Sequence, residues 1–245
     1  MVFIHGFCEN KEIWRAFEEK LSAGYRPISV DLPGFGESTT NSNFRSVEAM
    51  ANEVKKVLDA EAITSCVVVA HSLGGYVALA LAEQHPWLLK GFCLFHSTAY
   101  ADSEEKKHTR NKTADFLEKK GLDPFLDTFV PALFFAGRRE QLGDTLATYR
   151  ALTRQTPLAT AVAVTQAMRD RPDRTNVLQE AAYPVMFIAG REDTAVPLEA
   201  SREQFFLPKE STVHILAETG HMGMYEQPAK TLEMVESFVR QATAS

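Results

Sequence analysis

Three side chains in this 245-residue sequence have the types that acyl transfer needs: Ser72, Asp193 and His221. A serine hydroxyl is a weak nucleophile at neutral pH. It needs an imidazole that takes its proton and a carboxylate that holds the imidazole in the right tautomer. The sequence therefore predicts Ser72 as a nucleophile, His221 as its base and Asp193 as the residue that orients the base.

The surroundings of Ser72 favour this role. The apolar, β-branched run at 66–70 indicates a buried strand, and the glycines and alanines after Ser72 predict a helix that begins at once. A strand-to-helix turn of this kind strains the residue at its centre, and the small residues Ala70 and Gly74 let strand and helix approach closely. The backbone N–H of Leu73 would lie at the helix start, where it can donate to an oxyanion. The alternative is that Ser72 only caps the helix.

The acid and the base are expected in turns that follow strands, because sites in parallel sheets form beyond the carboxyl ends of the strands. Asp193 follows the apolar run at 183–189, and His221 follows the run at 212–216. Asp102 also follows a strand and is the alternative acid. The Gly-x-x-Asp turn at 190–193 favours Asp193.

A second oxyanion donor is expected from the loop after an early strand. His5-Gly6-Phe7 follows the apolar run at 2–4, so the backbone N–H of Phe7 is the predicted donor. His5 is expected to hold this loop, and His71, which precedes the nucleophile, is expected to have a structural role.

Strands alternate with helices over most of the chain, which predicts an α/β fold with a doubly wound, mainly parallel sheet. The alternation stops in the middle, where 98–182 reads as an all-helical insertion. We therefore predict a core made of 1–97 and 183–245, with 98–182 as a cap. The cap contains apolar residues that either line a pocket or, for most of them, pack its helices on the core: Phe125, Phe129, Leu133, Phe134 and Phe135.

Composition narrows the class of function. The net charge of −6 leaves no basic footprint for nucleic acid or a membrane surface, and no apolar run is long enough to span a membrane. The three cysteines have no paired spacing and are expected as buried free thiols: Cys8, Cys66 and Cys93. With no leader sequence apparent, a cytoplasmic protein is expected, as a monomer or homodimer.

Neither a metal nor a cofactor is predicted. Four histidines stand alone without ligand spacing: His85, His96, His108 and His214. Gly34-Phe35-Gly36 lacks the third glycine of a dinucleotide-binding loop.

The motifs together resemble the α/β-hydrolase superfamily: His5-Gly6-Phe7, the loop at 31–38, Ala70-His71-Ser72-Leu73-Gly74-Gly75, the turn at 190–193 and Gly220-His221. The resemblance implies the same nucleophile, base, acid and oxyanion donors, and it implies that the helical insertion is a lid. Two features depart from the family pattern. Ala70 replaces the first glycine of the elbow, and the sequence given begins inside the strand that ends at His5, where the family usually has one or two earlier strands.

The leading hypothesis is hydrolysis of a carboxylic ester, or a related small acyl compound, through an acyl-enzyme. The same three residues would also serve a C–C bond hydrolase, a thioesterase or a lactonase. A different class is a hydrolase-like ligand sensor with slow turnover. Family members that use an aspartate nucleophile are not favoured, because the elbow carries Ser72.

Overall fold

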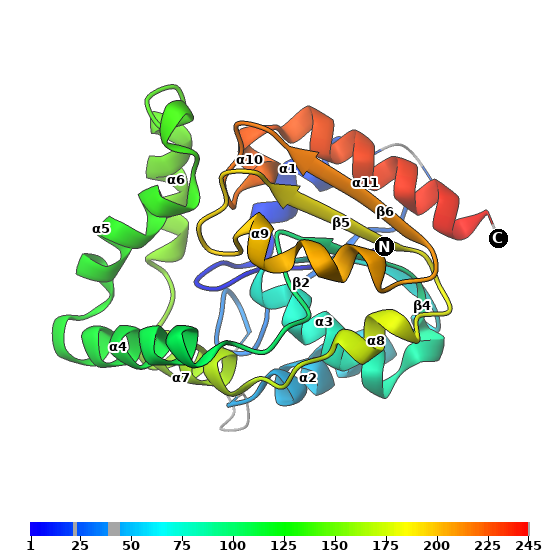
Figure 1. The fold of residues 1–245 in the computed structure, drawn as a ribbon, viewed down its shortest axis with the longest axis horizontal. Helices are drawn as coiled ribbons and strands as arrows, with labels where there is room; N and C mark the ends of the chain where they lie inside the picture. Colours follow the sequence, from blue (N-terminus) through cyan, green and yellow to red (C-terminus); the bar gives the residue numbers. More distant parts are fainter. Residues whose placement is uncertain (22–23, 39–44, 245) are drawn as a thin grey trace.

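A six-stranded sheet organises the molecule, and every neighbouring pair of strands is parallel. The computed structural model describes residues 1–21, 24–38 and 45–244. The strand order is β2-β1-β3-β4-β5-β6 (Figure 1). The strands are β1 (Val2–Ile4), β2 (Ile28–Val30), β3 (Cys66–His71), β4 (Leu89–Phe95), β5 (Val185–Gly190) and β6 (Ser211–Leu216).

Successive side chains of the central strands enter two different cores. Val68 packs on one face of the sheet, whereas Val67 and Val69 pack on the other. This alternation follows from the two-residue period of a strand, and burial on both faces explains why β3 is apolar throughout. The predicted doubly wound α/β fold is therefore confirmed.

Helices cover both faces. The Val68 face is covered by α2 (Val47–Ala60), α3 (Leu73–Gln84), η2 (Pro86–Leu88), α8 (Thr175–Gln179), α9 (Leu198–Ser201) and η4 (Arg202–Phe206). The opposite face is covered by η1 (Lys11–Trp14), α1 (Arg15–Glu18), α10 (Gly223–Glu226) and α11 (Pro228–Thr243). Sequence sets the ends of these helices: Ser46 caps α2 by accepting a hydrogen bond from the N–H of Ala49, at 3.2 Å.

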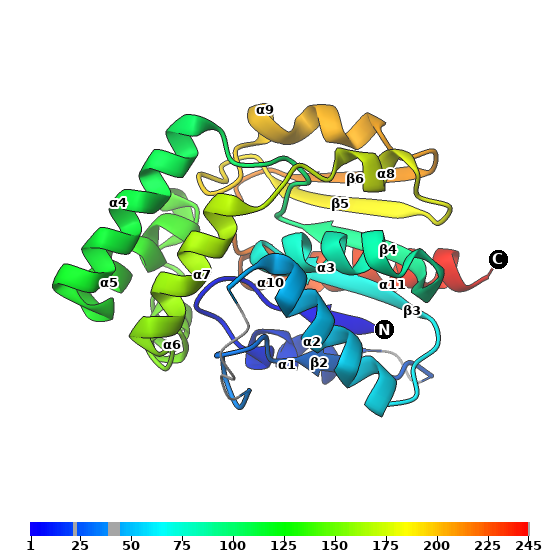
Figure 2. The same cartoon turned by 90° about the horizontal axis from the view of Figure 1, so that it is seen from below.

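Between β4 and β5, helices are the only regular secondary structure in the segment, and all of its residues are described. It contains α4 (Glu104–Lys120), α5 (Leu122–Leu133), η3 (Ala136–Arg138), α6 (Gly143–Thr153), α7 (Leu158–Asp170) and finally α8. Helices α4 to α7 stand together at one end of the sheet (Figure 2). The strands β5 and β6 point toward that end (Figure 1). Where the cap begins and ends stays a prediction, since α8 packs with α3 on the sheet.

Helix α4 is mostly exposed to solvent. Only Ala114 and Leu117 are buried along its length, as the narrow apolar stripe of the sequence indicates. Cys8, Cys66 and Cys93 are buried and unpaired, as expected. Among the described helices, none combines the length and the apolar character that crossing a membrane requires.

Candidate active site

Ser72 lies in the turn between β3 and α3 with a strained backbone. Its φ of 49° and ψ of −116° are unusual for a residue with a side chain. Hydrogen bonds fix this conformation: the N–H of Ser72 donates to the Phe95 carbonyl at 3.0 Å, and the hydroxyl of Ser97 donates to the Ser72 carbonyl at 2.7 Å. The Ser72 side chain makes no capping hydrogen bond to α3, so its hydroxyl is not used as a cap.

Gly74 allows α3 to approach the end of β1. A Cβ atom at this position would lie 2.5 Å from the carbonyl oxygen of Ile4 and 2.6 Å from that of His5. Only glycine fits so close an approach. The start of α3 is therefore held against the loop that contains Phe7. Within the described part of the chain, the backbone N–H groups of Phe7 and Leu73 have no acceptor, so both are free to bind an oxyanion.

Asp193 and His221 come together although 28 residues separate them. Nδ1 of His221 lies 2.7 Å from Oδ2 of Asp193, and both side chains are buried. The other carboxylate oxygen accepts hydrogen bonds from the N–H groups of Ala195 and Val196, at 2.8 and 2.9 Å. With Nδ1–H donated to Asp193, Nε2 of His221 is the nitrogen that can accept a proton.

The electrostatics keep Asp193 ionised. Burial alone would raise the pKa of its carboxyl. The interaction with His221 and the hydrogen bonds from His221 and His96 outweigh that effect and hold the pKa far below its usual range. Among the described contacts, no hydrogen bond joins the Ser72 hydroxyl to His221. Such contacts are often long without substrate and shorten when it binds.

Asp102, the alternative acid, has other partners. Its two oxygens lie 3.1 Å from Nε of Arg110 and 2.7 Å from Nη1 of Arg171. The structure thus brings Asp193 to His221 and leaves Asp102 in an ion-pair cluster at the start of α4.

His96 lies behind Asp193, and its position was not predicted. Its Nδ1 lies 3.3 Å from Oδ2 of Asp193. With a proton on Nδ1, the ring donates to that oxygen, and Nε2 accepts from the N–H of Gly223, at 3.3 Å. Burial lowers its pKa to about 4, only partly offset by Asp193, so the ring is neutral at pH 7. A neutral ring supports Asp193 without competing for its charge.

The same three side chains also form the group among the described residues that could surround a metal ion. One ligand atom each from His96, Asp193 and His221 lies within 4.8 Å of the others. The hydrogen bonds from His221 and His96 to Asp193, and from the N–H of Gly223 to His96, already account for this arrangement.

A second buried carboxylate, Glu9, binds the two loops of the site together. One oxygen accepts from the N–H of Gly6 and lies 2.9 Å from Nδ1 of His71. Its other oxygen accepts from the hydroxyl of Tyr149 on α6, at 2.7 Å. Nε2 of His71 lies 3.0 Å from the carbonyl oxygen of His221. Sequence reasoning missed Glu9, because its partners His71 and Tyr149 lie 62 and 140 residues away along the chain.

Glu226 performs a similar task at the loop of His221. Its oxygens accept from the N–H groups of Gly220 and Met222 on that loop and of Phe135 in the helical segment, at 2.8 to 3.2 Å. The N–H of His221 itself donates to the carbonyl of Leu133. The position of His221 therefore depends on the end of α5 as well as on the sheet.

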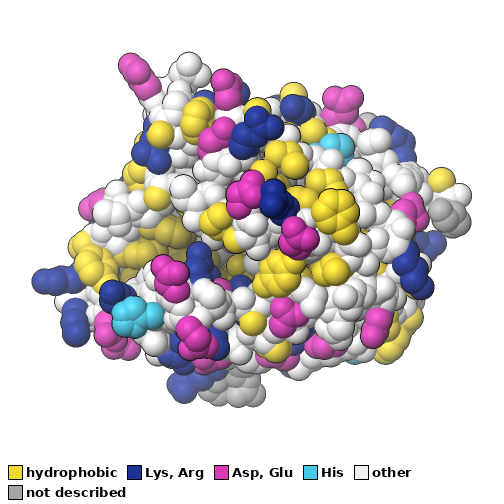
Figure 3. Space-filling model, viewed as in Figure 1, with side chains coloured by type: hydrophobic (Ala, Val, Ile, Leu, Met, Phe, Trp, Pro, Cys, Tyr) yellow, Lys and Arg dark blue, Asp and Glu magenta, His cyan; other side chains and the backbone are white. Residues whose placement is uncertain are grey.

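Aromatic side chains of α5 face the predicted oxyanion loop. The rings of Phe125 and Phe129 are stacked at 4.8 Å and contact the ring of Phe7 edge-on, at 6.2 and 5.8 Å. Phe134, in contrast, is buried against Tyr149. The surface is hollowed between this helical segment and the sheet, with hydrophobic side chains on its wall (Figure 3).

Comparisons with known proteins agree with this geometry. A family model described as the alpha/beta hydrolase family matches residues 1–234. The chain is 29% identical, over 98% of its length, to a biotin biosynthesis bifunctional protein of Teredinibacter turnerae, of which it covers 44%. Over 93% of its length it is 25% identical to a dihydrolipoyllysine-residue acetyltransferase component of an acetoin cleaving system from Cupriavidus necator, of which it covers 60%. The chain thus spans about half the length of these two relatives.

A solved structure matches over nearly the whole chain. It is a thermophilic esterase from Thermogutta terrifontis, with a TM-score of 0.92 and 26% identity, and the match covers 98% of this chain and 89% of that one. The family model, the parallel sheet and the strained serine turn lead to one conclusion: this chain belongs to the alpha/beta hydrolase family.

Proposed function

We propose that this protein hydrolyses a carboxylic ester of a small molecule through an acyl-enzyme on Ser72. The observation that carries the proposal is the 2.7 Å contact between Asp193 and His221, since it leaves one imidazole nitrogen available as a base near the Ser72 turn. Similarity to a solved esterase at 26% identity supports the choice of ester among the acyl substrates.

The reaction would proceed in two halves. Nε2 of His221 takes the proton from the Ser72 hydroxyl while the oxygen attacks the ester carbonyl carbon. The tetrahedral oxyanion accepts hydrogen bonds from the N–H groups of Phe7 and Leu73, and His221 then passes its proton to the departing alkoxide. Water, activated by His221, releases the acid from Ser72. Asp193 stays charged throughout.

The wall above the oxyanion loop supports an apolar component of the substrate. Phe125 and Phe129 are half-buried and lie against Phe7. An acyl or alkoxy chain in contact with these rings would be removed from water, which favours binding by about 25 cal/mol for each Å² of apolar surface buried.

The test combines a screen of p-nitrophenyl esters of increasing acyl length with labelling by a fluorophosphonate probe. We expect turnover and a single labelled serine in the wild type, and loss of both in Ser72→Ala. Ser237→Ala, on α11, is the matched control and should behave as wild type. Thermal denaturation checks that the Ser72→Ala protein is folded.

Two outcomes would overturn the proposal. Ester turnover that survives in folded Ser72→Ala would place the chemistry elsewhere. A wild type that reacts once and stops, without release of the acid, would favour a ligand sensor over an enzyme.

A further inference from the structure

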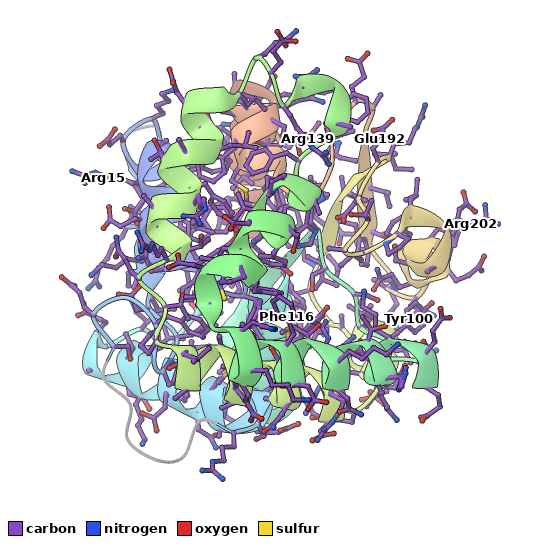
Figure 4. The ribbon with its side chains drawn as sticks, turned by 90° about the vertical axis from the view of Figure 1, so that its left-hand side faces the viewer. Arg15, Tyr100, Phe116, Arg139, Glu192 and Arg202 are labelled. Carbon is purple, nitrogen blue, oxygen red and sulfur yellow. The ribbon has the colours of Figure 1, made fainter. Side chains whose placement is uncertain are left out.

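A cavity of about 300 Å³ lies beside the proposed active site. It is enclosed by the loop after β4, the start of α4, the loop after Asp193 and helix α9. Tyr100 lies at the start of α4, on the side nearer α9 (Figure 4). The polar lining residues are Tyr76, Thr98, Tyr100, Asp102, Ser103, Lys106, Arg171 and Ser201.

The cavity is lined by residues from the helix that follows Ser72 and from the loop that follows Asp193. Tyr76 lies on the first turn of α3, one helical turn after Ser72. Ala195 and Val196 line the cavity, and their N–H groups hold the carboxylate of Asp193. The cavity therefore adjoins both the helix that begins after Ser72 and the loop that holds Asp193.

Cations outnumber carboxylates among the residues that line this cavity. The lining contains two cations, Lys106 and Arg171, and one carboxylate, Asp102. Asp102 is paired with Arg171 and also with Arg110, which lies just outside. One carboxylate thus pairs with two guanidinium groups. Lys106 adds a third cation, and among the described residues no carboxylate lies within ion-pair distance of its ammonium group.

Lys106 has hydrogen-bonding capacity to spare. Its ammonium group donates to the carbonyl oxygen of Ala195 at 3.0 Å. Within the described residues, this is its only acceptor, so two N–H bonds remain. Burial lowers the pKa of Lys106, and the nearby Arg110 and Arg171 lower it further, with partial compensation from the carboxylates of Asp102 and Asp193. An anion in the cavity would relieve that repulsion.

On the basis of the proposed function, we propose that this cavity binds a carboxylate of the substrate through Lys106. The preferred esters would then carry an anionic group a few atoms from the reacting carbonyl. Lys106 determines specificity in this scheme. The alternative is that Lys106 only ties α4 to the loop after Asp193.

The kinetic test compares monoethyl adipate with ethyl heptanoate, which places an alkyl group where the adipate ester carries its carboxylate. We expect the wild type to show a higher kcat/KM for the anionic ester. Lys106→Met should lower kcat/KM for that ester by roughly ten- to a hundredfold, the range of a charge-assisted hydrogen bond, and leave ethyl heptanoate almost unchanged. Lys106→Arg should retain the preference.

Lys107→Met is the matched control. It removes the same charge one residue along, where the ammonium pairs with Glu104 on the surface, and it should not alter the preference. If the wild type shows no preference for the anionic ester, or if Lys106→Met slows both esters equally, the inference is wrong and Lys106 is a structural tie.

A binding measurement separates failure of this inference from failure of the proposed function. Calorimetric titration of adipate into Ser72→Ala protein needs no turnover. We expect binding that Lys106→Met weakens and Lys107→Met does not. Adipate that fails to bind overturns the inference even if neutral esters are hydrolysed. If adipate binds through Lys106 but the wild type hydrolyses no ester, the anion site is supported and the proposed reaction is refuted.

Discussion

Two of the buried carboxylate–histidine pairs in the described chain, Asp193–His221 and Glu9–His71, differ in whether the imidazole is free to exchange a proton. In the Asp193–His221 pair, one imidazole nitrogen faces the carboxylate and the other has no acceptor on the described residues. In the Glu9–His71 pair, one nitrogen faces Glu9 and the other faces the carbonyl oxygen of His221. A carboxylate and an imidazole thus leave one nitrogen available in the first pair, whereas both nitrogens are engaged in the second.

The surroundings of His71 favour its charged form. Both of its nitrogens face acceptors, and a doubly protonated ring can donate to both. Burial would lower its pKa, but the charge and hydrogen bond of Glu9 and the carbonyl of His221 outweigh burial and raise it. Burial would raise the pKa of Glu9, and the charge and hydrogen bond of His71 lower it instead. What surrounds the second nitrogen decides whether a histidine moves a proton or holds one.

The largest expected effect comes from breaking the first pair. Asp193→Asn should lower kcat by about 10⁴-fold with little change in fold, because an amide neither holds the right tautomer of His221 nor stabilises its charged form. Stopped-flow or steady-state ester kinetics measure this. Asp144→Asn, on α6, is the control. A loss of less than about tenfold would remove Asp193 from the proposed role.

Breaking the second pair should act mainly on stability. Glu9→Gln leaves His71 without its carboxylate, and loss of one partner of a buried ion pair destabilises a protein by about 3–5 kcal/mol. Urea denaturation at pH 6 measures the free energy of unfolding. A variant as stable as wild type would show that the Glu9–His71 pair makes no net contribution to the free energy of unfolding. The distinction between a reactive pair and a stabilising pair would then be wrong.

The difference in unfolding free energy between wild type and Glu9→Gln should depend on pH in a definite direction. The raised pKa of His71 makes its contribution complete below 6.5, and the contribution is lost as pH rises through the raised value. The lowered pKa of Glu9 makes its contribution complete above 4.5, and that is lost as pH falls through the lowered value. The difference in unfolding free energy between wild type and Glu9→Gln should therefore be largest between pH 4.5 and pH 6.5, and it should decrease at lower and at higher pH.

The smallest effect concerns the hydrogen bond that joins the second pair to the helical segment. Tyr149→Phe removes the hydroxyl that donates to Glu9 and should cost about 1.5–3 kcal/mol, the range for a hydrogen bond to a charged group. Hydrogen exchange along α6 should increase. Unchanged exchange there would show that Glu9 does not hold α6.

Sequence reasoning performed well where a residue and its neighbours carry the signal together. The β-branched run, Ser72 and the glycines after it predict a strained turn, and the φ of 49° at Ser72 is such a turn. Asp193 and His221 were predicted as acid and base because each lies in the turn after a strand, and a parallel sheet brings such turns to one edge; the structure places the two side chains in contact.

Reasoning from the sequence failed for residues whose partners are distant. Glu9 meets His71 across 62 residues and Tyr149 across 140. Glu226 holds Phe135, 91 residues away. No local pattern marks such pairs, because a buried carboxylate is identified by what surrounds it and those groups come from other elements.

By itself, the sequence determined the alternation of strands and helices, the elbow at Ser72 and the exit turns that carry Asp193 and His221, because each depends on neighbours within a few residues. Only the tertiary structure decided which histidine is free to exchange a proton and where unpaired positive charge collects beside the site. Those properties depend on burial and on the second partner of each group, and both arise when distant segments pack together.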